Sequence, residues 1–177
     1  ETMTIVNTSG WDTDCNSGNL GCLLGIRNGL AAFEGGPDWR GPVADRMYLP
    51  SADGGRCITD AAAEAYALVN AARRLAGLEP IAPKHGAKFH FELPGSLQGF
   101  TAAQSSGLAL QNVAGHSVSG IRSLEIRFPP TGVDSPRRVS TPTFFAPEAM
   151  QMPGYELVGS PTLYSGQRIE AKIWADN

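Results

Sequence analysis

An α+β chain in two parts, helical first and β-rich afterwards, is the fold class that this sequence predicts. The 177 residues are 42% hydrophobic and 18% charged, which is the composition of a globular protein. Two early stretches have the apolar content and spacing of helices, whereas the later half alternates apolar and polar residues in short runs. We therefore expect an all-α portion followed by an antiparallel β-sandwich of the jelly-roll type.

The first predicted helix covers residues 15–33. It carries glycines at spacings of three and four residues, which places them on one face: Gly18, Gly21, Gly25 and Gly29. Leucines and isoleucines are spread around the rest of the helix. Because each glycine costs about 1 kcal/mol relative to alanine, this stripe predicts a buried helix with another backbone packed close to it.

The second predicted helix covers residues 60–77. Thr59 is the predicted N-cap and Asp60 a first-turn acid, while Arg73 and Arg74 occupy the last turn and Gly77 ends the helix.

A change in composition after Glu79 predicts the domain boundary. Three prolines precede this residue and ten follow it. The segment 77–86 combines a glycine with two prolines, which stop a helix. We expect a helical portion over 1–79, a linker over 80–86 and a β-sandwich over 87–177.

Short runs with strand character fill the second part. They are 89–93, 108–110, 124–128, 139–145, 155–158 and 169–173. The string KFHFELPGSLQGF, residues 88–100, resembles the opening strands of galactose-binding-like and other carbohydrate-binding β-sandwiches. The resemblance implies a glycan-binding module, whose aromatic side chains would either stack on a sugar or belong to the core. The candidates for such a platform are Phe100, Tyr155, Tyr164 and Trp174.

Charge and cysteine content restrict the partners. The net charge is −3, so nothing in the charge balance predicts nucleic-acid binding, and no apolar run reaches the roughly 20 residues that cross a bilayer. Three cysteines in a chain of this size favour reduced thiols and a cytoplasmic location. The chain does not begin with Met, and we expect its true start to lie elsewhere.

A pair of aspartates precedes the first helix in the string SGWDTDCNSGNLG, residues 9–21. Asp12 and Asp14 stand two residues apart, so both reach one cation only if the backbone between them is not helical. Hard divalent cations prefer such oxygen ligands. The alternative is structural: one side chain caps the helix and the other carboxylate interacts with the helix dipole.

Three strings in the first 78 residues resemble the ADP-ribosylglycohydrolase family, which includes the dinitrogenase reductase-activating glycohydrolases. The first, GWDTDCNSGNLGCLLGIRNG, resembles the family's C-terminal metal motif, in which a Gly-x-Asp-x-Asp-Thr/Ser turn opens a helix rich in small residues. PDWRGPVADR and ITDAAAEAYALVNAARRLAG resemble the segments that follow it in many members. The three strings occur in the family's order.

The resemblance implies a helical hydrolase with a two-metal centre, usually magnesium with manganese as the alternative, that cleaves a glycosidic bond to ADP-ribose. Its partner would be an ADP-ribosylated substrate or a small molecule like ADP-ribose. By position, Asp12 and Asp14 would be metal ligands. Cys15 stands where the family has Thr or Ser; a thiol is a softer ligand, so Cys15 either does not contact the metal or shifts the preference toward manganese or zinc. The other alternative for Cys15 is a small buried hydrophobic residue.

The family's second acidic motif, Thr/Ser-Asp-Asp, does not occur in this sequence. Two aspartates cannot fill the shells of two magnesium ions, each with about six oxygen ligands. The resemblance therefore implies a site completed by residues outside this sequence, and we expect the 177 residues alone to be inactive. The alternative is a non-catalytic carbohydrate-binding or structural module.

Overall fold

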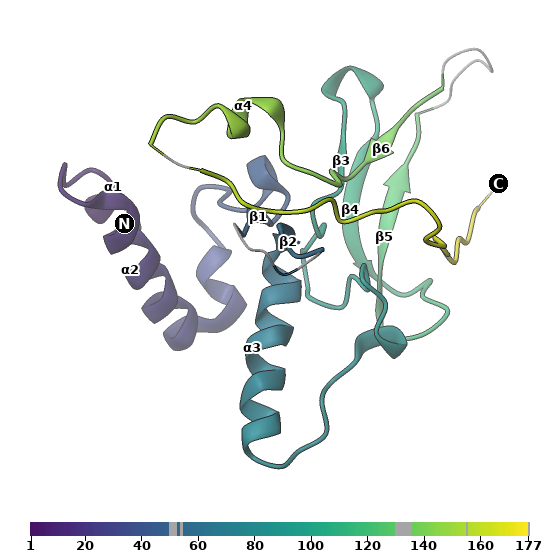
Figure 1. Cartoon of the computed structure of the whole chain (residues 1–177), viewed down its shortest axis with the longest axis horizontal. Coiled ribbons are helices and arrows are strands. Elements are labelled where there is room, and N and C mark those ends of the chain that lie inside the picture. The colour runs from purple at the N-terminus through teal and green to yellow at the C-terminus, as the bar shows by residue number, and fades with distance from the viewer. Residues whose placement is uncertain (50–52, 54, 130–135, 155, 177) are drawn as a thin grey trace. The chain divides into compact units, whose positions relative to one another are not determined.

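A computed structural model describes residues 1–49, 53, 55–129, 136–154 and 156–176. Contacts divide the chain into two compact units, Glu1–Trp39 and Arg40–Asn177, and each unit is described by itself (Figure 1). Both helices and small antiparallel sheets are present, so the mixed α+β class is confirmed. Within the described ranges, every helix is too short or too polar to cross a bilayer.

The first unit is a pair of helices followed by a 3₁₀ turn. α1 covers Thr2–Asn7, α2 covers Thr13–Asn28 and η1 covers Gly29–Phe33. α1 contacts α2, and the Ser17 hydroxyl on α2 donates a hydrogen bond to the Asn7 side-chain oxygen on α1.

The predicted helix is therefore present in α2, but its predicted burial is wrong. No residue of α2 is buried. A Cβ placed on Gly18, Gly21 or Gly25 would meet nothing within 4 Å among the described residues, so the glycine stripe faces open space there. The physical reason is that the apolar side chains of α2 are spread around the helix, and Leu23 and Ile26 remain 63% and 83% exposed.

The second unit begins with a hairpin-like pair that leads directly into its main helix. η2 covers Gly41–Val43, β1 covers Arg46–Tyr48, β2 covers Ile58–Asp60 and α3 covers Ala61–Leu75. β1 and β2 are antiparallel, with Arg46 opposite Asp60.

The prediction of a helix at α3 is confirmed, including Arg73 and Arg74 in its last turn. The cap is Asp60, not Thr59 as predicted, because the Asp60 carboxylate accepts a hydrogen bond from the Ala63 amide at 2.9 Å. Thr59 lies on β2 and its hydroxyl donates to the Glu64 carboxylate at 2.7 Å.

The rest of the second unit consists of short elements. These are η3 Pro83–His85, β3 Thr101–Ala102, η4 Gln104–Ser106, β4 Ala109–Ala114, β5 Arg122–Arg127, β6 Val139–Ser140 and α4 Pro147–Met150. β4 pairs with β5, and β3 pairs with β6, both antiparallel (Figure 1). The described strands form three two-stranded sheets.

Several predicted strands are wrong. Residues 87–100 and 169–173 contain no strand. In the first segment Phe91 has a φ of 58°, a left-handed conformation that interrupts an extended run. Residue 155, in the predicted 155–158 run, lies outside the described residues, and 156–158 is not a strand. The runs at 108–110, 124–128 and 139–145 do overlap β4, β5 and β6.

The core of the second unit is small and contains many polar groups. Its apolar cluster is Cys57, Ile58 and Phe145, with Leu157 packed against it. The buried polar residues are Asp45, Asp60, His90, Ser96, Gln98 and Asn112. Buried polar groups require hydrogen-bond partners, so the polar side chains of this unit define its structure as much as the apolar ones do.

Candidate functional site

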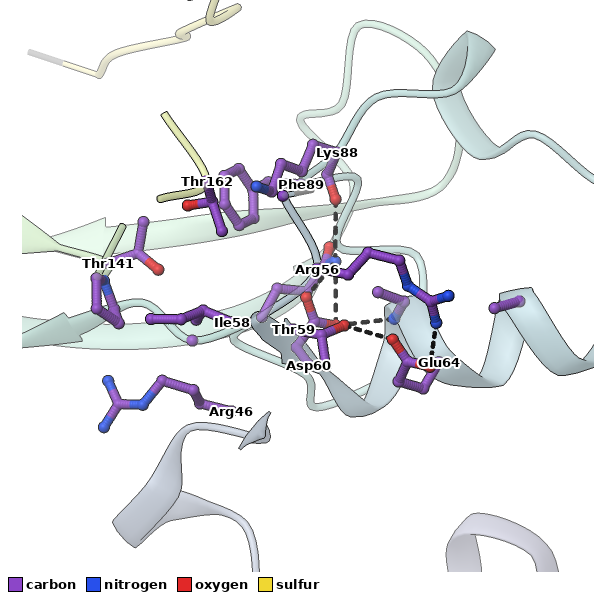
Figure 2. A pocket seen from close by; sticks show the side chains of 16 residues that line it. Arg46, Arg56, Ile58, Thr59, Asp60, Glu64, Lys88, Phe89, Thr141 and Thr162 are labelled. Carbon is purple, nitrogen blue, oxygen red and sulfur yellow. Dashed lines mark hydrogen bonds and ion pairs between the residues drawn. The ribbon is translucent and has the colours of Figure 1, made fainter. Parts of the chain in front are cut away.

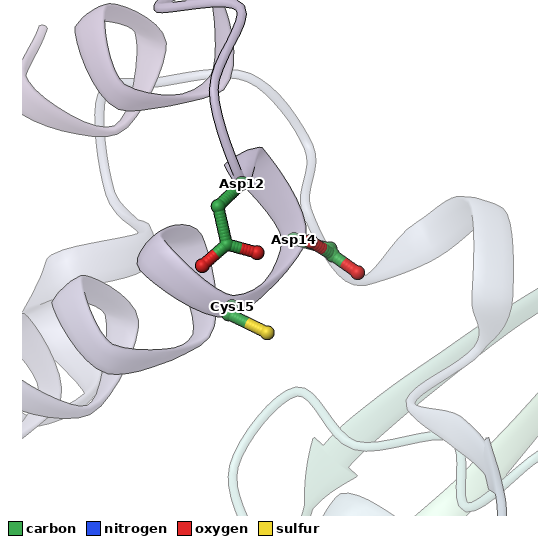
Figure 3. A group of neighbouring side chains, drawn as sticks. All are labelled: Asp12, Asp14 and Cys15. Atoms are coloured by element: carbon green, nitrogen blue, oxygen red, sulfur yellow. The ribbon is translucent and has the colours of Figure 1, made fainter.

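The structure brings Asp12, Asp14 and Cys15 together at the start of α2 (Figure 3). One potential ligand atom from each residue, two carboxylate oxygens and the thiol sulfur, lies within 4.8 Å of the others, and all three residues are exposed. Asp12 precedes the helix with a φ of 44° and a ψ of 47°. This left-handed conformation provides the non-helical backbone that the spacing required, and it lets the two carboxylates approach each other.

Helix capping does not account for the Asp12 side chain. Asp12 occupies the N-cap position, yet its carboxylate makes no capping hydrogen bond to the helix. Asp14 lies in the first turn, where a negative charge interacts favourably with the helix dipole. The Asp12 carboxylate therefore remains available to a ligand or to the neighbouring thiol.

Cys15 interacts with both aspartates. A hydrogen bond with Asp12, together with the negative charges of Asp12 and Asp14, raises the pKa of the Cys15 thiol above its usual value. The thiol thus keeps its proton at neutral pH and donates it in the hydrogen bond to Asp12. Cys15 is exposed, so its interpretation as a small buried hydrophobic residue is wrong.

The three groups fit part of a divalent metal site. Opposite ligands on an octahedral magnesium ion lie about 4.2 Å apart, so atoms within 4.8 Å of one another need only small side-chain rotations to reach one ion. Two carboxylates suit magnesium or manganese, whereas a thiolate suits zinc. The two carboxylates, or all three groups if Cys15 loses its proton, fill at most half of one octahedral shell, and other ligands are needed to complete it.

The predicted sugar-stacking residues have different surroundings. Phe100 packs against Phe89 and Phe91 at centroid distances of 4.9 and 5.7 Å. Trp174 stacks on His116 at 4.5 Å and is 56% exposed, and Tyr164 is 47% exposed. Tyr155 lies outside the described residues. Phe100 therefore belongs to an aromatic cluster, while Trp174 and Tyr164 present ring surface to solvent.

A pocket of about 170 Å³ lies in the second unit beside β2 and α3 (Figure 2). Its charged lining residues are Arg46, Arg56, Asp60, Glu64 and Lys88, and its threonines are Thr59, Thr141 and Thr162. Ile58, Ala63, Ala67, Phe89 and Pro142 provide apolar wall.

Both carboxylates of the pocket already have partners. Glu64 accepts from Arg56 at 2.8 Å and from the Thr59 hydroxyl at 2.7 Å. Asp60 accepts from the Ala63 amide and from the Gln98 side-chain amide, whose nitrogen lies 3.3 Å from each carboxylate oxygen. Figure 2 shows Asp60, Glu64, Thr59 and Arg56 close together beside the start of the helix.

Two other cations that line the pocket, Arg46 and Lys88, lack acidic partners among the described residues. Among the described residues, the Arg46 guanidinium makes no hydrogen bond or ion pair, and the Lys88 ammonium has only the Phe89 ring, 5.6 Å from its centroid. The Thr141 hydroxyl likewise has no hydrogen bond within the described part of the chain. The pocket therefore has a surplus of positive charge and of hydrogen-bond donors.

A buried histidine lies close to this pocket. His90 is 5% exposed and packs edge-on against Tyr66 at 4.9 Å. Burial lowers the pKa of His90, an effect larger than the opposite influence of the Asp60 and Glu92 carboxylates. The Glu92 amide donates to His90 Nδ1 at 3.0 Å, which places the imidazole proton on Nε2.

Sequence patterns found the aspartate pair but not the pocket. Asp12, Asp14 and Cys15 are close in the chain, so a local motif reveals them. Arg46, Lys88 and Thr141 come from three distant segments, and none belongs to a motif. Their only common signal is that they are polar residues beside short apolar runs, which is too general to identify a site.

Comparisons with protein-family models, with curated proteins and with solved structures find no match to this chain. The resemblance to ADP-ribosylglycohydrolases thus depends on the residues of the first 78 positions themselves.

Proposed function

We propose that this chain is the C-terminal part of a metal-dependent hydrolase that cleaves a glycosidic bond to ADP-ribose. The observation that supports the proposal is the meeting of Asp12, Asp14 and Cys15 at the start of α2, with ligand atoms within 4.8 Å of one another. In the proposed enzyme these residues form one side of a two-metal magnesium or manganese site, and residues outside this sequence supply the remaining ligands.

The residues of this chain would bind the metal and orient its carboxylate ligands. Asp12 and Asp14 would each supply a carboxylate oxygen, while the protonated Cys15 thiol donates a hydrogen bond to Asp12 and keeps that carboxylate oriented. When bound, the metal ions would activate a water molecule and stabilise the charge that develops on the sugar. The exposure of all three residues leaves room for a substrate and for further ligands.

Metal binding is tested by calorimetric titration of Mn²⁺ and Mg²⁺ into the chain. We expect weak, saturable binding in the wild type and its loss in Asp12→Asn and Asp14→Asn. Glu34→Gln is a matched control, because it removes one exposed negative charge from the same unit without touching the site. Equal binding by all four proteins, or none by the folded wild type, would contradict the proposed site.

The reaction is tested on the natural polypeptide that contains this sequence. Its release of ADP-ribose from an ADP-ribosylated peptide should require magnesium or manganese and should be lost in Asp14→Asn. A metal-independent release, or full activity of the variant, would rule out this function while leaving the metal-binding result intact.

An alternative function is a carbohydrate-binding or structural module in the second half. It is favoured by the exposed rings of Trp174 and Tyr164, a type of side chain that stacks on sugars, and it would make the strand pairs β3–β6 and β4–β5 parts of a jelly-roll-like sandwich. A glycan array tests it: retention that Trp174→Ala abolishes would favour this function, and absence of retention would remove it.

A further inference from the structure

The strongest unassigned feature is the pocket beside β2 and α3 in the second unit, which lies outside the proposed metal site. Its volume of about 170 Å³ is more than ten times the roughly 10–15 Å³ that a single water molecule needs, and below the roughly 300–1,000 Å³ of pockets for drug-sized ligands. The space therefore suits a small organic molecule of a few carbon atoms rather than a single ion or a nucleotide.

The distribution of charge indicates the sign of the ligand. The Glu64 carboxylate forms an ion pair with Arg56, and the Asp60 carboxylate already accepts hydrogen bonds from the Ala63 and Gln98 amides. Arg46 and Lys88 have no acidic partner among the residues that the structure describes. An anionic ligand would give these two cations the partners that the protein does not supply.

The arrangement of donors indicates where an anionic group would lie. In Figure 2, Thr141 lies between Lys88 on one side of the pocket and Arg46 on the other. Both cations have long side chains that can turn toward an oxyanion at Thr141, and the threonine hydroxyl can donate a third hydrogen bond. A phosphoryl group accepts several charge-assisted hydrogen bonds at once, more than a carboxylate does.

A glycine keeps this part of the pocket open. Gly99 has a φ of +81°, and a Cβ at this position would lie 3.3 Å from the Thr141 hydroxyl oxygen and 3.8 Å from the Arg46 Cβ. Its amide donates to the Ala44 carbonyl at 2.8 Å, which fixes the backbone. The absence of a side chain at residue 99 therefore leaves space between Arg46 and Thr141.

We propose that this pocket binds a small organic phosphate. The phosphoryl group lies at Thr141 between the Arg46 guanidinium and the Lys88 ammonium, and the organic part contacts the apolar wall formed by Ile58, Ala63 and Phe89. Binding requires no metal and does not depend on the proposed hydrolase activity.

Calorimetry at constant ionic strength tests this proposal with four probes: glycerol 3-phosphate, inorganic phosphate, glycerate and glycerol. We expect glycerol 3-phosphate to bind most tightly, inorganic phosphate more weakly, glycerate more weakly than the organic phosphate, and glycerol not measurably. Glycerate binding as tightly as glycerol 3-phosphate would overturn the phosphate assignment. Inorganic phosphate binding as tightly as glycerol 3-phosphate would overturn the organic part, and no binding by the folded chain at millimolar concentration would overturn the whole proposal.

Variants locate the site. Arg46→Gln and Lys88→Gln should each weaken binding of glycerol 3-phosphate about tenfold or more, as expected for loss of a charge-assisted hydrogen bond. Arg74→Gln is the matched control, because Arg74 is exposed on α3 and does not line the pocket. Equal affinities in the three variants would overturn the proposal.

Thr141→Val provides a test that leaves both cations in place. It should weaken binding while the protein keeps the wild-type circular dichroism spectrum. In the wild type, the amide resonances of Gly99 and Thr162 should shift on addition of glycerol 3-phosphate. Shifts confined to residues away from the pocket would contradict the assignment even if the chain bound the probe.

Discussion

Gly159 lies against the apolar cluster of the second unit, at a point with no room for a side chain. A Cβ there would be 2.5 Å from the Cys57 Cβ and 2.9 Å from Phe145 Cε2. Gly159→Ala should therefore lower the free energy of unfolding by about 1–3 kcal/mol, the usual cost of overpacking a core, measured by urea denaturation. The control Ser165→Ala changes an exposed residue in the same unit. Equal stability of both variants would show that this contact can relax without cost.

His90 makes the stability of the second unit dependent on pH. Burial lowers the pKa of His90 in the folded protein, whereas in the unfolded chain the imidazole has its ordinary pKa of about 6.5. Below that pH the unfolded state binds more protons than the folded state, so the free energy of unfolding falls as the pH falls. We expect urea titrations to show this loss from about pH 6.5 downward.

The variant His90→Gln removes the titrating group and should flatten this part of the pH profile. His85→Gln, at an exposed position, should keep the wild-type slope. Glu92 changes the stability of the folded protein in a more acidic pH range than His90 does. Burial acts to raise the pKa of Glu92, but hydrogen bonds from the Ile121 and Arg122 amides and from Lys84 outweigh burial and lower the pKa. A His90→Gln profile identical to the wild type would assign the slope to another group.

The Asp60 side chain makes two interactions at the start of α3. Asp60 caps the helix through the Ala63 amide and accepts from Gln98. Asp60→Ser keeps a capping oxygen but loses the charged partner of Gln98, and Asp60→Ala loses both. We expect Asp60→Ala to be the less stable variant by about 1 kcal/mol, the typical value of a cap, in urea denaturation followed by circular dichroism. Equal losses would show that the helix start gains nothing from the cap.

Helices with strong local signals were predictable, and their surroundings were not. α3 has an acidic start, an apolar repeat and a terminal glycine, so its sequence alone identifies it. α2 was identified by its length and apolar content, but the glycine stripe led to a wrong prediction of burial. Burial depends on what packs against a helix, and the periodicity of one segment does not contain that information.

The strand predicted at 89–93 was wrong for a related reason. Phe89, Phe91 and Leu93 alternate as in a strand, yet the Phe91 amide donates to the Gln98 side chain at 2.6 Å and the Phe91 carbonyl accepts from Asn112 at 2.8 Å. Buried side-chain amides take the hydrogen bonds that a neighbouring strand would have made. Alternation of apolar residues predicts a strand only where the backbone of the segment makes its hydrogen bonds to the backbone of a neighbouring strand.

The same distinction between local and distant partners separates the two candidate sites at the scale of the whole molecule. Asp12, Asp14 and Cys15 lie within four positions of the chain. The spacing of the two aspartates predicted that they could meet, and Cys15 was added by the resemblance to the ADP-ribosylglycohydrolase family. The pocket requires β1, the start of α3 and residues beyond 140 to lie together. Only the fold determines that arrangement, so the residues that line the pocket could be identified only from the structure.

Gln98 connects the segments of the second unit and is 1% exposed. Its side-chain amide donates to Asp60 and to the Lys88 carbonyl, and its oxygen accepts from the Phe91 amide. Gln98→Ala removes all three bonds and leaves buried groups without partners, which costs about 1–3 kcal/mol for each such group. We expect a total loss of about 3 kcal/mol or more by urea denaturation, whereas Gln167→Ala, at an exposed position, should cost little.

A double-mutant cycle with Asp60→Ala shows whether Gln98 acts as one member of a network. Because Asp60 and Gln98 are direct partners, the double variant should lose less stability than the two single variants together, with a coupling of about 0.5–3 kcal/mol. Additive losses would mean that each residue stabilises its own segment separately. A coupled result would instead show that Asp60 and Gln98 act together. The buried polar side chains would then stabilise the contacts between β2, α3 and residues 87–100, the segments that form the pocket, in addition to the apolar cluster.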